Sequence, residues 1–226
     1  MTVGVKKTRS EVVYDEVRAE ILNGEISPGV RLKIADLGAR FGVSLSVVRE
    51  ALTRLGEQGL VVSNPQRGFN VVDVSADDLQ DITYVRIQIE TMALKDSIEH
   101  GGVAWESLVV SAHHTLERTP LHLPDGRVNG QWLEVHRAFH QALLEGCGSP
   151  RLQSIANSLR DGAELYRVWS GTLAHDKRDL AGEHRAIMEA ALAGEVDSAQ
   201  QRLAEHIGRT TEALLSCSRI DVPPIT

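Results

Sequence analysis

Two histidines stand one helical turn apart in the stretch WLEVHRAFHQALLEG, residues 132–146. Because His136 and His140 are four residues apart, a helix would place both imidazoles on one face, where they could bind a single metal ion. The stretch is amphipathic, and this face should point toward a protein interior. An HxxxH pair alone is weak evidence, because most such pairs are ordinary surface or core histidines. The pair raises the question of a metal site without answering it.

Two further histidines fall on apolar helix faces later in the chain. His184 in AGEHRAIMEAAL shares a face with Ile187, and His206 in AQQRLAEHIGRT lies beside Leu203. Burying four neutral imidazoles without a common purpose would leave many ring nitrogens without partners, whereas one ion satisfies a nitrogen of each. We therefore predict a metal site, provided that the three helices meet. Its ligands would be His136, His140, His184 and His206.

The elements that must position these histidines are helices. From Ser75 onward, apolar residues recur with a helical period and no convincing strand pattern appears. The segment TPLHLPDGRVNG is a loop by its proline and glycine content. Helices are predicted over about 75–100, 103–118, 130–146, 150–171, 178–193 and 196–216. Residues 76–226 should therefore form an all-α bundle of six or seven helices.

The first 75 residues follow a different pattern. SEVVYDEVRAEILNGEISPG indicates one helix, and LKIADLGARFGVSLSVVREALTRLGEQGL indicates two short helices around a turn at Gly42. LVVSNPQRGFNVVDV then reads as strand, turn and strand. Three helices followed by a β-hairpin are typical of a winged helix-turn-helix. The predicted fold class is mainly α, with this domain over residues 1–75.

Candidate DNA-contacting residues lie at the start of the second helix of the helix-turn-helix and along the hairpin. A recognition helix presents its N-terminal side chains to base edges in the major groove. Arg49 can pair with guanine or phosphate, and serine hydroxyls suit phosphate oxygens. The candidates are Ser44, Ser46, Arg49, Arg54, Arg67 and Gly68. Alternatively, the arginines form a solvated face and the unit is an interaction module.

Charge and composition narrow the class of protein. Residues 1–75 hold 10 Lys and Arg against 9 Asp and Glu, whereas residues 76–226 hold 14 against 22, as expected for a DNA-binding head on an acidic body. No apolar run approaches the roughly 18 residues that span a bilayer. Cys147 and Cys217 lack a CxxC spacing, which favours reduced thiols over a disulfide framework. We expect a cytoplasmic protein with no membrane partner.

The run GVSLSVVREALTRLGEQGLVVSNPQRGFNVVDV resembles the N-terminal domain of GntR-family bacterial regulators, and the resemblance covers residues 10–74. The matching positions are Val43, Ser44, Val48, Arg49, Glu50, Ala51, Leu52, Leu55, Gly59, Leu60 and Gly68. Leu45 stands where the family usually has arginine, and Val47 where it often has proline or threonine. Losing that arginine removes a DNA contact, so the operator cannot be inferred from relatives.

Residues 77–217 resemble the FCD ligand-binding domain of the FadR subfamily, marked by Asp-x-x-x-His on its fourth helix and one histidine on each of the last two. His140, His184 and His206 match, and His136 stands at the usual aspartate. A site of four imidazoles should favour Zn²⁺ or Ni²⁺ over Mn²⁺. Alternatively, His136 holds the effector or a water. The runs HRAFHQALLEGCGSPRL and EHRAIMEAAL are most similar to the carbon-starvation-induced regulators.

The resemblance also implies that a small carboxylate fills open positions on the metal. Arg86 matches an arginine that could clamp this carboxylate, or it forms an i,i+4 ion pair with Glu90. Tyr166 and Arg167 are further candidates if they face the same cavity. Cys147 is interpreted as a small core residue. The remaining histidines are assigned to the surface or loops: His100, His113, His114, His122 and His175.

The combined prediction is a one-component transcription regulator and not an enzyme. It would bind double-stranded operator DNA as a homodimer, because one short helix reads too few base pairs, and a small organic acid would relieve repression. The main alternative is a metal-dependent hydrolase, disfavoured because no HExxH and no evident general-base carboxylate accompany the histidines. A second alternative is a structural metal with an unrelated effector.

Overall fold

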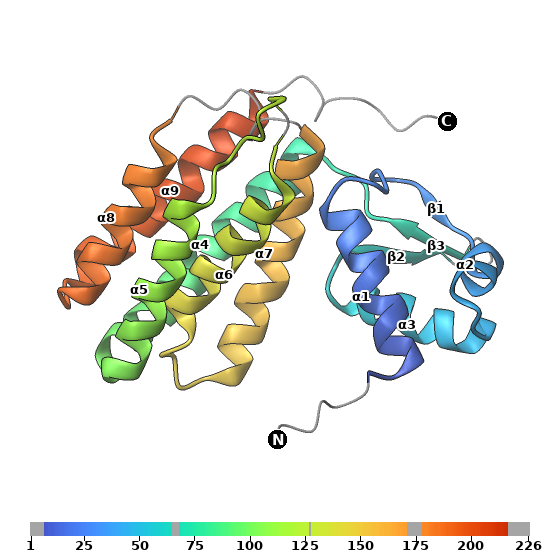
Figure 1. Ribbon diagram of the computed structural model, residues 1–226, viewed down its shortest axis with the longest axis horizontal. Coiled ribbons are helices and arrows are strands. Elements are labelled where there is room, and N and C mark those ends of the chain that lie inside the picture. The colour runs from blue at the N-terminus through green and yellow to red at the C-terminus, as the bar shows by residue number, and fades with distance from the viewer. Residues whose placement is uncertain (1–6, 65–67, 127, 171–177, 217–226) are drawn as a thin grey trace.

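The computed structural model describes residues 7–64, 68–126, 128–170 and 178–216, which form two parts (Figure 1). The N-terminal part comprises α1 (Arg9–Leu22), β1 (Arg31–Leu32), α2 (Ile34–Phe41), α3 (Leu45–Glu57), β2 (Val61–Asn64) and β3 (Gly68–Val71). The C-terminal part comprises α4 (Ala76–His100), α5 (Gly102–Arg118), α6 (Gly130–Leu144), α7 (Pro150–Ser170), α8 (Leu180–Leu192) and α9 (Val196–Leu215).

The N-terminal part is a winged helix-turn-helix, as predicted. α2 ends at Gly42, whose φ of 62° lies in the left-handed region that glycine adopts without strain. The antiparallel sheet has the order β1-β3-β2, with Leu32 opposite Phe69 and Val62 opposite Asn70. β2 and β3 are the predicted hairpin. The sequence pattern does not indicate β1, because two residues are too few to show a strand period.

An apolar stripe on α1 organises the winged helix. Val13, Val17 and Ile21 recur every four residues and are fully buried. They belong to one core cluster with apolar residues of α3 and the sheet. Leu165 of α7, from the C-terminal part, belongs to the same cluster. The core of the winged helix therefore includes a side chain from the helical bundle.

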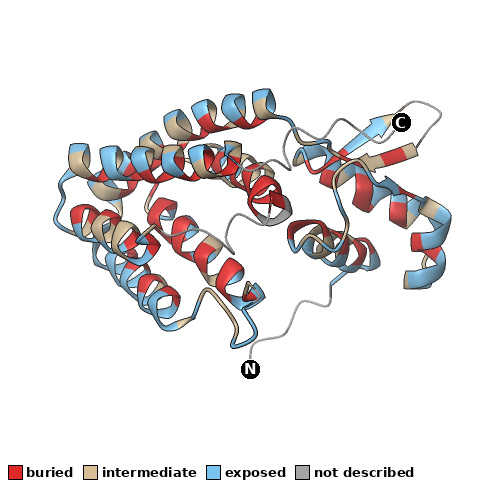
Figure 2. Ribbon diagram, turned by 90° about the horizontal axis from the view of Figure 1, so that it is seen from above, coloured by how far each residue is buried: buried red, intermediate tan, exposed pale blue. Residues whose placement is uncertain are grey.

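α4 is the central helix of the C-terminal part and contacts α6, α7, α8 and α9. Ser75 caps its start by accepting a hydrogen bond from the backbone N–H of Asp78, which the Ser-x-x-Asp pattern indicates. Figure 2 shows buried residues on the sides of the helices that face one another. The six helices agree with the predicted ranges to within about two residues at each end. The fold-class prediction is confirmed.

The two parts meet along α1 and α7 (Figure 1). The Arg18 guanidinium on α1 pairs with the Asp161 carboxylate on α7, and Asp161 is buried. The Ser158 hydroxyl donates to the backbone carbonyl of Gln58, at 3.3 Å. Contact through α7 thus combines an ion pair, a hydrogen bond and apolar packing. Over the described ranges, no helix has both the length and the apolar character needed to cross a membrane.

Gly146 marks a close approach that should not tolerate a side chain. A Cβ there would lie 2.9 Å from the Ser97 carbonyl oxygen and 3.0 Å from the Gly101 Cα, so the end of α4 and the turn after α6 would have to separate. We expect Gly146→Ala to lower the free energy of unfolding by about 1–3 kcal/mol, measured by denaturant titration.

The same substitution at Gly208 is the matched control. A Cβ at Gly208, inside α9, has no neighbour within 4 Å. Gly208→Ala should therefore raise the free energy of unfolding by about 0.5–1 kcal/mol through helix propensity. Unchanged stability in Gly146→Ala would show that the turn can move without cost.

Candidate metal and DNA-binding sites

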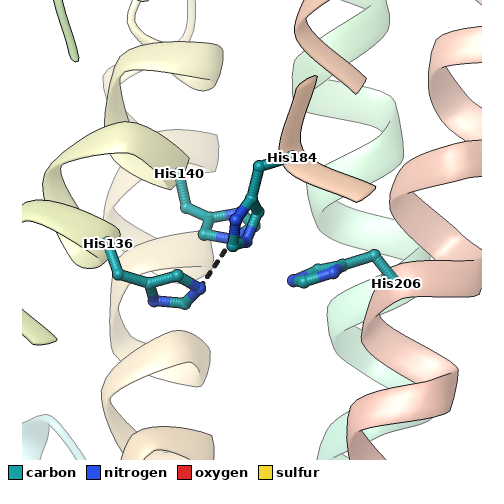
Figure 3. Close-up of side chains that lie close together, drawn as sticks. All are labelled: His136, His140, His184 and His206. Atoms are coloured by element: carbon teal, nitrogen blue, oxygen red, sulfur yellow. Dashed lines mark hydrogen bonds between the residues drawn. The ribbon is translucent and has the colours of Figure 1, made fainter. Parts of the chain in front are cut away.

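Four histidines from three helices meet inside the bundle (Figure 3). His136 and His140 come from α6, His184 from α8 and His206 from α9. Each residue is at most 3% exposed. One ring nitrogen from each can be chosen so that all four lie within 4.8 Å of one another. The structure thus brings together the set that the sequence pattern singled out.

The spacing of two of the rings fits a shared metal ion. Adjacent nitrogens at the usual zinc–nitrogen length of about 2.0–2.1 Å from one ion lie roughly 3–3.4 Å apart. The Nε2 atoms of His136 and His140 are 3.2 Å apart. Among the described residues, one buried ring nitrogen on each of His140, His184 and His206 has no hydrogen-bond partner. An ion bound through the Nε2 atoms would give those of His184 and His206 the partner that burial demands, while Nδ1 is the unpartnered nitrogen of His140.

Glu183 orients the most distant ring of the set. The Nδ1 atom of His206 lies 2.8 Å from a Glu183 carboxylate oxygen, which makes Nδ1 the donor and leaves Nε2 free for the cluster. Arg178 and Arg209 lie 3.6 Å and 3.4 Å from the same carboxylate. The sequence did not indicate a contact between Glu183 and the cluster, because Glu183 directly precedes His184 and neighbours on a helix point to different faces. The face of α8 that carries Glu183 packs against α9, where Glu183 reaches His206.

Arg167, a candidate effector-binding residue, lies at the edge of the histidine cluster. Its Nη1 atom is 3.0 Å from Nδ1 and 3.2 Å from Nε2 of His136, and its side chain is buried. Glu164 lies 3.4 Å from the same guanidinium nitrogen. A buried guanidinium at the edge of a metal cluster is suited to hold an anion that also reaches the ion.

Arg86 forms an ion pair with Glu90, which is one of the two roles that the sequence allowed for it. Its Nε donates to Glu90 Oε1 at 2.9 Å, and Arg160 donates to Glu90 Oε2 at 3.0 Å. Burial raises the pKa of Glu90, but Arg160 and Arg86 outweigh it and hold the pKa below its usual range. The three side chains form a buried group with a net positive charge. Among the described residues, Arg86 forms no hydrogen bond or ion pair with the four histidines, so its role as a clamp stays a prediction.

Tyr166 does not face the histidines, and this corrects the expectation that it lines their cavity. Its hydroxyl donates to the Asp78 carboxylate and accepts from the backbone N–H of Ser75, and its ring packs with Leu79 and Leu214. Adjacent residues on a helix point about 100° apart, so Tyr166 and Arg167 cannot face the same place. Tyr166 instead ties α7 to the start of α4.

His113 is a second correction, because it is buried and not on the surface. It lies on α5 with 6% exposure, and its ring meets Phe139 edge-on with centroids 5.5 Å apart. Cys147 is buried as predicted. His100 and His114 are exposed, His122 lies in the loop after α5, and His175 and Cys217 lie outside the described residues.

Burial keeps the histidine cluster uncharged. It lowers the pKa of His136, His140 and His184 well below the ordinary value, and Arg167 lowers that of His136 further. Burial also lowers the pKa of His206, although the hydrogen bond to Glu183 acts in the opposite direction. Neutral imidazoles are the form that binds a metal ion. The folded chain therefore holds its candidate ligands in the binding-competent state at neutral pH.

The candidate DNA-contacting residues of α3 lie at its exposed start. Ser44 is the N-cap, its hydroxyl is 2.9 Å from that of Ser46, and both residues and Arg49 are exposed. Leu45, in place of the family's arginine, is 56% exposed in the same turn.

The other DNA candidates lie further along the winged helix. The Arg54 guanidinium lies over the Tyr14 ring of α1, at 4.3 Å from its centroid. Gly68 begins β3 with a φ of 89°, and Arg67 lies outside the described residues.

Comparison with known proteins identifies both parts. Residues 9–71 match the gntR family of bacterial regulatory proteins, and residues 81–209 match the FCD domain. The chain belongs to the GntR family and carries an FCD domain. Members of this family regulate transcription, so the protein is a DNA-binding transcriptional regulator and not an enzyme. Glu183, the acid nearest the cluster, is already committed to His206, which also disfavours a hydrolase.

Relatives in other bacteria share nearly the whole chain. The chain is 37% identical to the uncharacterized HTH-type transcriptional regulator BphR of Paraburkholderia xenovorans, over 87% of this chain and 81% of the relative. It is 29% identical to the HTH-type transcriptional repressor GlaR of Escherichia coli, over 86% and 90%. The structure of E. coli McbR/YncC shares the fold with a TM-score of 0.77 at 22% identity, covering 93% of this chain and 98% of that one.

Metal-free protein should lose stability as the pH falls below about 6.5. The unfolded chain takes up protons near that pH, whereas the folded histidines do so only at lower pH. The unfolded state then binds more protons, and each additional one costs up to about 1.4 kcal/mol of stability per pH unit. We expect the thermal midpoint of chelator-treated protein to be nearly constant above this value and to fall below it.

A pair of variants separates the cluster from other titrating groups. His140→Gln removes one buried imidazole, so its stability should fall less steeply between about pH 6.5 and pH 5 than that of the parent. His100→Gln changes an exposed ring and should keep the parental slope. Equal slopes in both variants would mean that the buried cluster does not govern the acid response.

Proposed function

We propose that the protein is a one-component repressor in which residues 76–226 sense a small carboxylate at a zinc ion and residues 1–75 bind operator DNA. The observation that carries this proposal is the buried set of four neutral imidazoles with the Arg167 guanidinium at its edge, inside an FCD domain. GlaR, a relative along most of the chain, is described as a transcriptional repressor, which favours repression. We also propose that, within the FadR subfamily, the protein is most similar to the carbon-starvation-induced regulators.

The donor set favours zinc, with nickel as the alternative. Four neutral nitrogens suit borderline ions, and without a carboxylate the site loses the hard oxygen that manganese prefers. When bound, the ion supplies a positive centre that attracts a carboxylate oxygen. Arg167 would hold the second oxygen of that carboxylate through a charge-assisted hydrogen bond. Arg86 would contribute to binding of the carboxylate only through the net positive charge of the buried group that it forms with Glu90 and Arg160.

α7 supports a route from this site to the DNA-binding part. Arg167 contacts His136, while Asp161, nearly two turns earlier, pairs with Arg18 of α1 and lies 3.8 Å from Arg137 of α6. Leu165 belongs to the core of the winged helix. An anion that draws Arg167 away from His136 would act on the helix that carries these contacts. The effector would thereby favour an arrangement of the winged helices that fits the operator less well.

The proposal includes a homodimer that acts on DNA in the cytoplasm. Two recognition helices related by a twofold axis would read the two halves of a near-palindromic operator. Tyr84 and Met92 lie about two turns apart on one exposed face of α4, with 67% and 56% exposure. A second copy covering this face would remove both side chains from water, which favours association.

Two substitutions should separate DNA binding from metal binding. Arg49→Ala should weaken operator affinity about tenfold or more, since a lost base or phosphate contact costs about 1–3 kcal/mol, and should leave zinc content unchanged. His140→Ala should lower zinc content and abolish release by small carboxylates while retaining operator binding. Fluorescence anisotropy with the chain's own upstream DNA and metal analysis of each variant provide the measurements.

Random DNA of equal length is the control for specificity. Equal affinity of the parent for operator and random DNA would contradict the regulator proposal. A full carboxylate response in zinc-free His140→Ala would instead support a structural metal with a separate effector site.

Breaking the ion pair on α7 should uncouple the two parts. Asp161→Asn keeps the side-chain shape but removes the charge that pairs with Arg18. We expect zinc content to persist, and carboxylate-induced loss of operator affinity to shrink several-fold. Asp15→Asn is the matched control, because it removes an exposed ion pair with Lys7 on the same α1 helix without touching α7. A parental response in Asp161→Asn would exclude this ion pair from the route.

A further inference from the structure

A pocket of about 330 Å³ adjoins the histidine cluster. Its walls come from the end of α5 and the loop that follows, the start of α6 and the start of α8. Three aromatic or imidazole rings line it, those of His113, Trp132 and His184. The volume lies at the lower end of the range of about 300–1,000 Å³ that small-molecule sites occupy.

Two of these rings connect the pocket to the candidate metal site. His184 lines the pocket and also belongs to the cluster. Trp132 lines the pocket and stacks on His136, with ring centroids 4.6 Å apart and planes 19° apart. A molecule with one end at the cluster can therefore extend its other end along Trp132 into the pocket.

The pocket wall is mostly apolar. Its aliphatic surface comes from Leu116, Pro120, Leu121 and Leu180. The charged residues around it have other partners: Glu117 pairs with Arg185 of α8, Arg178 lies near Glu183, and the Asp179 carboxylate caps α8 by accepting from the backbone N–H of Gly182 at 2.9 Å. His113 adds a polar ring edge to this wall.

We propose that this pocket receives the apolar body of the effector, which makes the effector a monocarboxylate carrying a ring-sized apolar group. This rests on the proposed function, because the carboxylate is placed at the ion and Arg167. A sugar acid or a short dicarboxylate would press hydroxyl groups or a second charge against Leu116, Leu121 and Leu180, whose side chains form no hydrogen bonds. Burying polar groups without partners is costly, so such acids bind less well.

The test compares four acids on the zinc-loaded full chain by titration calorimetry and thermal midpoint. Acetate supplies the carboxylate alone, benzoate adds an apolar ring, succinate adds a second charge, and gluconate adds hydroxyl groups. We expect benzoate to bind at least about tenfold more tightly than each of the others, because its ring is removed from water in the pocket.

A variant that fills the pocket tests its location. Ala181 lines the pocket from the exposed first turn of α8, so Ala181→Trp adds bulk without opening a core. It should bring the affinity for benzoate close to that for acetate, with zinc content as the check on the cluster. Ala104→Trp, at an exposed position of α5 that does not line the pocket, is the matched control and should keep the preference.

The outcomes separate this inference from the function on which it rests. Equal affinities for acetate and benzoate, or tighter binding of succinate or gluconate, would overturn the inference and leave a carboxylate sensor standing. A parental benzoate preference in Ala181→Trp would also overturn it, since the ring would then bind elsewhere. Absence of binding by all four acids would count against the carboxylate sensor itself.

Discussion

The burial of four imidazoles in one helical core is the constraint on which the rest of the site depends. At most 3% exposed, these rings are held neutral, and each still has nitrogens that need partners. The chain meets that need locally only in part, through Glu183 for His206 and Arg167 for His136. A shared ion would give one ring nitrogen of each histidine a partner, which is why a core with so many polar rings is best understood as a binding site.

The charges around the cluster shape what can bind there. Neutral nitrogens leave an ion's full charge in place, and Arg167, paired with Glu164, adds a guanidinium at the edge. Arg160 and Arg86 outnumber Glu90 in the neighbouring buried group. An anion is thus favoured over a neutral molecule. The pocket beside Trp132 would then favour anions that carry an apolar group, since its wall is mostly aromatic and aliphatic.

α7 gives the two parts of the protein a common element. Successive residues of one helix face the histidines, the start of α4 and the core of the winged helix, because neighbours on a helix point in different directions. A rigid helix with contacts on several sides transmits a displacement at one side to the others. This arrangement would join the proposed sensing site to the DNA-binding part through one helix.

The sequence by itself determined the helix bounds, the winged helix and the four histidines, because apolar periodicity and capping residues are local signals. It also indicated Arg167 as a candidate effector-binding residue. For Arg86 it allowed two roles, binding of an effector or an ion pair with Glu90. The tertiary structure decided which neighbour each buried polar group meets: Glu90 for Arg86, Asp78 for Tyr166, Glu183 for His206. It also placed His113 inside a pocket wall. Periodicity fixes which face of a helix is buried, but the partner across the interface depends on how helices far apart in the chain rotate and pack.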